Sequence, residues 1–405
     1  MIRLLGERES GIIYPLIFQR AEVTRRNYCL ELSKHKDVEG VHKGSINSVD
    51  LDVIENRYLL SGAADSSIVI HDTQPANGEA QQTYKHVCQV SHNSGSTKHS
   101  VETIQWYPID TGMFTSSGAD YQLKIWDTNR LKVADKYSFH GIVYSHHMSG
   151  ISVKHCLIAV GCSRSTVKLV DMKAGSATHQ LRGHDSSVFV VQWSSRDEFL
   201  LATCGADNRV LLWDIRSAKG SLVTLDQHNG ESASHSKCAK TAHDGAVNGL
   251  RFTSDGLHLV TFGTDNQLRL WNAFTGKNML VNYGYVYNTS RKAAQIALSC
   301  SGSPDVVFAP SDSNIEVVDL YGGNRITTLR GHYNSVNCCI HDCQTQYLYS
   351  GGSDRNILVW APSSETEDYE EHLRDQSKES RGEKSFTQRT AATADTWSSD
   401  EEDNR

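Results

Sequence analysis

Short apolar runs alternate with polar turns along most of the chain, and residues 181–216 show this pattern most completely. In this stretch three runs of strand length are separated by turns that carry Gly, Asp, Asn or Ser. Such runs, rich in Val, Leu and aromatic residues, predict β-strands. The stretch opens with Gly183 and His184 and closes with Trp213 and Asp214.

The same pattern recurs along the chain. When the units are aligned on the Trp-Asp pair, they lie 42 to 58 residues apart, close to the ~40–45 residues of one WD-repeat blade plus insertions. The seven Asp-equivalent positions are Asp72, Asp127, Asp171, Asp214, Asn272, Asp319 and Ala361. A turn Asp lies six residues before the Trp position in six units, whereas the third unit has Arg164. We therefore expect an all-β fold, a seven-bladed WD40 β-propeller over residues 27–362.

Four polar positions recur together within the complete units. The sets are His184, Thr203, Asp207 and Trp213; His243, Thr261, Asp265 and Trp271; and His332, Ser350, Asp354 and Trp360. The first unit keeps His42, Ser61 and Asp65 but has His71 in place of Trp. A hydrolase triad occurs once in a chain, whereas these sets occur once per blade. They are therefore expected to be structural hydrogen-bond networks that fix strand register.

The two ends of the chain differ from the repeats. Residues 1–26 are expected to form an N-terminal helical segment, with a helix from Pro15 to about Arg26, since proline suits a first helical position. Three apolar residues near its start either pack on the side of the propeller or insert into a partner: Leu16, Ile17 and Phe18. The alternating run at 28–32 is expected to complete the last blade, which removes a free sheet edge. Residues 363–405 are predicted to be a disordered acidic tail.

Charge and cysteine content exclude several classes of function. The net charge is −7, and residues 363–405 carry 13 acidic against 6 basic residues, so the rest of the chain is neutral. A neutral body argues against direct nucleic-acid or membrane binding. The ten cysteines include no CxxC pair and mostly lie in apolar runs, which predicts buried free thiols in a reducing compartment. We expect no metal site, no cofactor and no membrane span.

Three long connections, at 91–100, 228–241 and 283–292, are expected on the face where the Gly-His turns emerge. Long loops on one face of a repeat array are either binding elements or tolerated insertions. Register alone places five further exposed residues on this face as candidates for substrate contact: Tyr121, Asp185, Asp244, Tyr333 and Arg355.

The fourth unit ends in Trp213-Asp214-Ile215-Arg216, which matches the WDxR box of substrate receptors of cullin-4 ubiquitin ligases. The arginine should leave the third strand on the face opposite the Gly-His turns. There a guanidinium can make several charge-assisted hydrogen bonds to a docked protein.

Other stretches that are not generic repeat residues extend this match. They include Arg20-Ala21-Glu22, Gln105-Trp106-Tyr107-Pro108, Tyr144-Ser145-His146-His147-Met148, Thr224-Leu225-Asp226-Gln227-His228-Asn229-Gly230 and the Trp397–Glu402 end. Over nearly its whole length the chain resembles the Cockayne syndrome A family of WD-repeat receptors.

The resemblance implies a non-catalytic subunit of a cullin-4 E3 ligase in transcription-coupled nucleotide excision repair in the nucleus. It implies docking to the damaged-DNA-binding adaptor, and through it to cullin-4 and its RING subunit, by the N-terminal segment and the WDxR face. The implied adaptor-binding residues are Leu16, Ile17, Phe18, Arg20, Asp214 and Arg216. The other implied partners are the Cockayne syndrome B translocase and the RNA polymerase II complex. The alternative is a WD40 scaffold of a signalling or chromatin complex without a ligase. An enzyme is disfavoured, because no unrepeated nucleophile–base pair is present.

Overall fold

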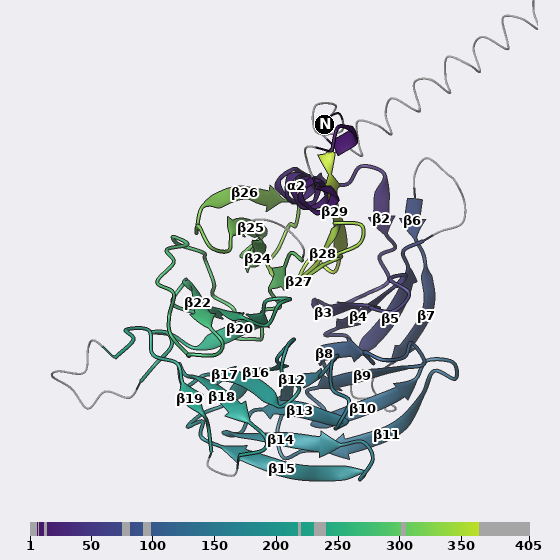
Figure 1. The fold of residues 1–405 in the computed structure, drawn as a ribbon. Coiled ribbons are helices and arrows are strands. Elements are labelled where there is room, and N and C mark those ends of the chain that lie inside the picture. The colour runs from purple at the N-terminus through teal and green to yellow at the C-terminus, as the bar shows by residue number, and fades with distance from the viewer. Residues whose placement is uncertain are drawn as a thin grey trace, which may run out of the picture.

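A computed structural model describes residues 6, 8–11, 14–74, 82–91, 99–217, 220–230, 240–300 and 305–363. Seven β-sheets are arranged in a ring around a central axis (Figure 1), so the predicted seven-bladed propeller is confirmed. The predicted tail beyond Ser363 and the central parts of the loops at 91–100 and 228–241 lie outside the described residues. Among the described helices, none has the length and apolar character needed to cross a membrane.

Each blade is an antiparallel sheet whose first strand faces the centre of the ring (Figure 1). Blade 1 contains β3 (Ile46–Leu51), β4 (Tyr58–Ala63), β5 (Ser67–Asp72) and β7 (His86–Ser91). Blade 2 contains β8 (Val101–Trp106), β9 (Met113–Gly118), β10 (Gln122–Asp127) and β11 (Lys132–Ser138). Blade 3 contains β12 (Val143–Met148), β13 (Leu157–Cys162), β14 (Thr166–Asp171) and β15 (Ser176–Arg182). Blade 4 contains β16 (Val188–Trp193), β17 (Leu200–Gly205), β18 (Val210–Asp214) and β19 (Val223–Thr224). Blade 5 contains β20 (Val247–Phe252), β21 (His258–Gly263) and β22 (Leu268–Asn272). Blade 6 contains β23 (Ala297–Leu298), β24 (Val306–Ser311), β25 (Asn314–Asp319) and β26 (Arg325–Arg330). Blade 7 contains β27 (Val336–His341), β28 (Leu348–Gly352), β29 (Ile357–Pro362) and β1 (Leu30–Leu32). A separate parallel pair joins β2 (Lys36–Val38) to β6 (Gln82–Tyr84).

Burial explains the composition of the strands. The second strand of a blade packs between neighbouring blades on both faces, and in β13 every residue is buried. The fourth strand lies at the outside of the ring, and in β15 nearly every residue is exposed. Apolar side chains therefore gather between the blades, where burying them stabilises the fold by about 25 cal/mol per Å² of apolar surface.

The complete tetrads form hydrogen-bonded chains inside their blades. In blade 4 the indole N–H of Trp213 donates to Thr203 Oγ1 at 2.8 Å, and this oxygen lies 2.8 Å from His184 Nε2. His184 Nδ1 lies 2.8 Å from Asp207 Oδ2. In blades 5 and 7 the corresponding distances are 2.7 to 2.9 Å. One hydroxyl therefore serves both a tryptophan and a histidine in each of these blades.

Protonation explains why these chains are fully bonded. Burial lowers the pKa of His243 in blade 5, so its imidazole is neutral at physiological pH. A neutral ring that donates from Nδ1 to the carboxylate accepts the hydroxyl proton at Nε2. Burial acts to raise the pKa of Asp207, but hydrogen bonds from His184 and from backbone N–H groups hold it below its ordinary value. Each donor thus meets an acceptor, as a buried network requires.

The histidine contacts of blades 1 and 2 differ from those of the complete tetrads. In blade 1, His42 bonds Ser61 at 2.7 Å but reaches Asp65 only through Ser67. In blade 2 the Trp126 indole N–H donates to Ser116 Oγ at 2.7 Å. His146 of β12, in the neighbouring blade, instead lies 2.8 Å from Thr115 Oγ1 and 2.7 Å from Ser117 Oγ of β9. The pair His146-His147 is therefore part of the packing between blades, which spacing along the sequence does not reveal.

The N-terminal segment closes the ring. β1 runs antiparallel to β29, with Leu32 opposite Trp360, and becomes the fourth strand of blade 7. The strand expected over 28–32 begins later than predicted, because the preceding helix α2 (Pro15–Tyr28) includes Tyr28. β29 is thereby paired on both sides, which protects this strand from pairing with another chain.

Blade 5 lacks a regular fourth strand. Asn278 forms an isolated bridge with Trp271 of β22 instead of a continuous ladder. The connection at 283–292 is anchored in the core by Tyr283 and Val286, which are buried among residues of blades 5 and 6. It is therefore an integral part of the packing rather than a loop laid on the surface.

We expect Thr203→Val to lower the free energy of unfolding by about 1–3 kcal/mol, because it leaves the Trp213 indole and His184 Nε2 without a partner in the core. Thr203→Ser is the matched control, since it keeps the hydroxyl and removes one methyl group, worth about 0.8 kcal/mol. Urea unfolding followed by tryptophan fluorescence measures both. A Val variant as stable as the Ser variant would show that the hydroxyl contributes nothing.

Candidate protein-docking faces

Strand direction divides the propeller into two faces. The first and third strands of each blade begin beside the Gly-His turn and the turn Asp, which define the Gly-His face. The turns that follow those strands emerge on the other side. We call this side the Arg216 face, because Arg216 lies in the turn after β18. Residues that follow β27, such as Thr345, lie on the Arg216 face by the same reasoning.

The C-terminal half of α2 is anchored to the Arg216 face at blade 7. Asn27 is fully buried and its Oδ1 lies 2.9 Å from His341 Nε2, while Arg26 Nη2 donates to the carbonyl of Thr345 at 3.0 Å. Figure 1 shows α2 beside β29. The helix continues to Tyr28, two residues past the predicted end near Arg26 and across the expected boundary at residues 26 and 27.

The N-terminal half of α2 extends away from this anchor. Leu16 is 69% exposed and Ile17 is 57% exposed, so neither side chain packs on the propeller. Phe18 is partly buried, with the Arg8 guanidinium 5.7 Å from its ring centroid, and Arg20 is exposed. Large exposed apolar side chains beside arginines are typical of protein-binding helices.

Asp214 orients Arg216 within the WDxR box. The guanidinium donates from Nε to Oδ1 at 2.9 Å and from Nη2 to Oδ2 at 2.7 Å, and lies 4.6 Å from the ring centroid of Phe199. These hydrogen bonds lower the pKa of Asp214, which stays ionised. The Arg216 side chain is 58% exposed. The pair therefore holds a planar cation in a fixed direction while its other N–H groups face solvent.

The neighbouring blades place aromatic residues where blade 4 has Arg216. Phe274 occupies this position after Trp271-Asn272 and is 93% exposed, and Tyr321 follows Asp319 in blade 6 and is 45% exposed. Neither residue was singled out from the sequence. The alignment on the Trp-Asp pair contains the signal, because both lie two residues after the Asp position.

The five candidates on the Gly-His face are all exposed in the structure: Tyr121, Asp185, Asp244, Tyr333 and Arg355. The tetrads set the position of three of them. The backbone N–H groups of Asp185, Asp244 and Tyr333 donate to the carboxylates of the tetrad aspartates at 3.1 to 3.3 Å. The same aspartate thus closes the buried network and fixes a surface turn.

The other two candidates have left-handed backbone. Tyr121 has φ 63° and Arg355 has φ 70°, at turn positions where blades 4 and 5 have Asn208 and Asn266. Asparagine tolerates this conformation, whereas other side chains with a Cβ pay about 1–2 kcal/mol. A tyrosine and an arginine at such positions are consistent with a binding role. Tyr285 and Tyr287, on the connection at 283–292, add exposed aromatic surface.

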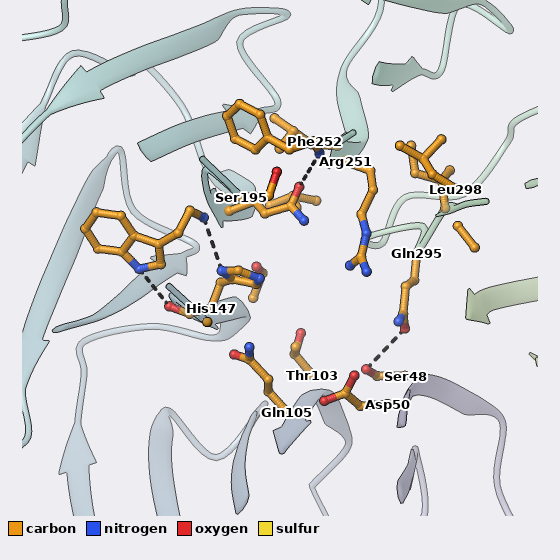
Figure 2. Close-up of a pocket in the computed structure, with 18 of the residues that line it drawn as sticks. Ser48, Asp50, Thr103, Gln105, His147, Ser195, Arg251, Phe252, Gln295 and Leu298 are labelled. Carbon is orange, nitrogen blue, oxygen red and sulfur yellow. Dashed lines mark hydrogen bonds between the residues drawn. The ribbon is translucent and has the colours of Figure 1, made fainter. Parts of the chain in front are cut away.

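Polar side chains surround a central cavity of about 440 Å³ (Figure 2). Four of them lie at the fifth position of the first strand in successive blades, and each accepts a backbone N–H from the first strand of the next blade at 2.7 to 3.1 Å: Asp50, Gln105, His147 and Gln192. Burial lowers the pKa of His147 to about 3, so its Nδ1 is free to accept. Arg251 holds the corresponding position in blade 5 and interrupts the series, because a guanidinium cannot accept a hydrogen bond.

Asp50 and Arg251 carry opposite charges in the lining of this cavity. Burial raises the pKa of Asp50 to about 7, although the Trp106 N–H and the positive charge of Arg251 act in the opposite direction. Burial likewise lowers the pKa of Arg251. Trp193, which also lines the cavity, is 2% exposed and belongs to the core.

One cysteine pair departs from the expectation of free thiols. Cys300 and Cys343 form a disulfide, with Cα atoms 5.7 Å apart, which corrects that prediction for these two residues. Seven other described cysteines are free, and Cys238 lies outside the described residues.

Comparison with known proteins places the chain among WD-repeat proteins. The family model "WD domain, G-beta repeat" matches residues 175–214, 236–272 and 323–361. Each of the three matches ends at the Asp-equivalent position of a unit that has a complete tetrad. The chain is 34% identical to WD repeat-containing protein ATCSA-1 of Arabidopsis thaliana, over 91% of this chain and 96% of that protein.

More distant relatives share the repeats. The chain is 24% identical to the serine-threonine kinase receptor-associated protein of Dictyostelium discoideum, over 60% of this chain and 74% of that protein. It is 23% identical to radiation-sensitive protein 28 of Saccharomyces cerevisiae, over 46% of this chain and 40% of that protein.

We expect Asp50→Asn to stabilise the protein at pH 8 and to have little effect at pH 4. A carboxyl whose pKa is about 7 when folded and near 3.8 when unfolded binds protons better in the folded state, so stability falls as pH rises from about 4 to 7. The Asp50 carboxyl changes the free energy of unfolding by at most about 1.4 kcal/mol per pH unit. Thermal melting across this pH range measures the difference, with Asp37→Asn on the exposed β2 as control. A gain from Asp50→Asn that does not change with pH would contradict the assignment.

Proposed function

Because the chain belongs to the family of WD-repeat proteins that includes ATCSA-1, we propose that it is the non-catalytic substrate-recognition subunit of a cullin-4 E3 ubiquitin ligase. In this role it acts in transcription-coupled nucleotide excision repair at stalled RNA polymerase II in the nucleus. WD40 propellers are typically non-catalytic platforms for protein assembly. The proposal adds an adaptor and a substrate to that general role.

The observation that carries the proposal is the composition of the Arg216 face. Consecutive blades present Arg216, Phe274 and Tyr321, and blade 7 carries the exposed apolar end of α2. Arginine and aromatic side chains are the residues that most often dominate binding energy in protein interfaces. We assign this face to the damaged-DNA-binding adaptor, which links the receptor to cullin-4 and its RING subunit.

The two halves of α2 suit this mode of docking. The anchored half fixes the direction of the helix, so that little conformational freedom is lost when a partner binds. The free half offers Leu16 and Ile17 to an apolar groove, as helix-in-groove recognition requires. Arg216 supplies the directional hydrogen bonds, held by Asp214.

The Gly-His face is then left for the substrate side. Tyr121, Tyr333 and Arg355 are exposed there, and the tetrad of blade 7 holds the turn of Tyr333 in place. We assign this face to partners at the stalled polymerase, including the Cockayne syndrome B translocase. The receptor accelerates ubiquitylation by holding lysines near a charged conjugating enzyme, without a nucleophile of its own.

Co-purification of the adaptor with the tagged full-length chain tests the proposal. We expect Arg216→Glu, Phe274→Asp and the double variant Leu16→Asp/Ile17→Asp each to weaken adaptor binding by about 30-fold, the loss that follows from removing one hot spot of about 2 kcal/mol.

Matched controls lie elsewhere on the propeller. Arg130→Glu reverses an exposed charge in the corresponding turn of blade 2, and Val87→Asp changes an exposed apolar residue on the outer strand β7. Tyr333→Ala alters the Gly-His face. All three should retain the adaptor. Undiminished recovery with Arg216→Glu and Phe274→Asp would favour a scaffold without a ligase.

A further inference from the structure

Three potential metal ligands meet on the Arg216 face between blades 6 and 7. Cys300 follows β23, His341 ends β27 and Cys343 lies in the turn after it. One ligand atom from each of these residues lies within 4.8 Å of the others. We call these three residues the thiol–imidazole cluster. It was not expected from the sequence, because 43 residues separate the two cysteines and no metal-ligand spacing is present.

The imidazole of His341 is prepared to bind a cation. Its Nε2 lies 2.9 Å from Asn27 Oδ1, an oxygen that can only accept, so Nε2 carries the proton. Nδ1 is therefore a lone-pair acceptor. Nδ1 is buried and has no hydrogen-bond partner among the described residues, in a side chain that is only 7% exposed.

The disulfide between the two cysteines does not satisfy this nitrogen. A disulfide sulfur has no proton to donate, so Nδ1 of His341 keeps an unused lone pair in the oxidised state. A divalent cation coordinated by the two thiolates would use it. The hydrogen bond from Nε2 to Asn27 has the form found at metal-bound histidines, whose second ring N–H donates to an oxygen that fixes tautomer and orientation.

We propose that the reduced form of the thiol–imidazole cluster binds a Zn²⁺ ion through the sulfurs of Cys300 and Cys343 and Nδ1 of His341. Two thiolates and one imidazole are a ligand set that zinc accepts, with a fourth position left for water. Cys343 is exposed, so solvent reaches that position and the ion has an entry path.

The reaction balances with a cellular thiol as reductant. Two thiol molecules transfer two electrons and two protons to the disulfide and leave as their own disulfide, which frees the two cysteine thiols. Zn²⁺ then displaces both thiol protons, which pass to the buffer, and two zinc–sulfur bonds form.

Zinc at this position would connect three elements. Cys300 belongs to blade 6, His341 and Cys343 belong to blade 7, and His341 is bonded to Asn27 of α2. The ion would therefore sit beneath the anchored half of α2. This inference does not depend on the identity of any protein that docks there.

The test uses the full-length chain, reduced by a phosphine that carries no thiol and titrated without oxygen. With Co²⁺ as probe we expect one equivalent to bind, with thiolate-to-cobalt charge-transfer absorption and the intense visible bands of a four-coordinate ion. One equivalent of Zn²⁺ should abolish both signals. Cys343→Ser changes an exposed side chain, so the variant should fold. We expect it to weaken zinc binding by about 100-fold or more, because losing a ligand should cost at least as much as losing a residue that only orients a ligand.

Cys156→Ser, at a half-buried free cysteine, is the matched control and should bind Co²⁺ like the wild type. The proposal is overturned if reduced wild-type protein takes up no more Co²⁺ or Zn²⁺ than Cys343→Ser. It is also overturned if the oxidised protein binds the metal equally well, because the thiolates would then not be ligands. Melting curves of each variant confirm that it is folded.

Discussion

One buried hydroxyl in each complete blade links the interior of this propeller to its surface. Thr203, for example, bonds both Trp213 and His184, and the histidine in turn bonds Asp207. Asp207 then accepts the backbone N–H of Asp185, which lies on an exposed turn. The same four side chains therefore hold strand register inside the blade and set the shape of the Gly-His face outside it.

The Arg216 face is organised differently, because its residues are fixed one blade at a time. Asp214 and Phe199 hold Arg216, whereas α2 is held by contacts with the turn after β27. A surface assembled from separate turns can change one binding residue without disturbing the core. This explains how Phe274 can stand in blade 5 where blade 4 has an arginine.

Much of the fold could be predicted because the decisive contacts are local. The tetrads join residues within about one repeat, and the closing strand follows from counting strands against the need for a closed ring. Contacts between blades could not be predicted in this way. His146 reaches Thr115 of the previous blade, and Cys300 meets Cys343 across two blades, because the curvature of the ring brings them together. The exposure of Leu16 also could not be predicted, because the sequence of a short helix does not determine whether an apolar side chain faces the propeller or the solvent.

Ring closure also determines the order in which the chain can fold during synthesis. Domains generally form from the N-terminus as the chain is made, and six blades contain only strands that are close in sequence. Blade 7 is different, because β1 is translated before every other strand of the propeller and β29 after all of them. Throughout that interval β1 lacks its strand partner. The nascent protein therefore carries the unpaired β1, directly after α2, while all the strands between β1 and β29 are made.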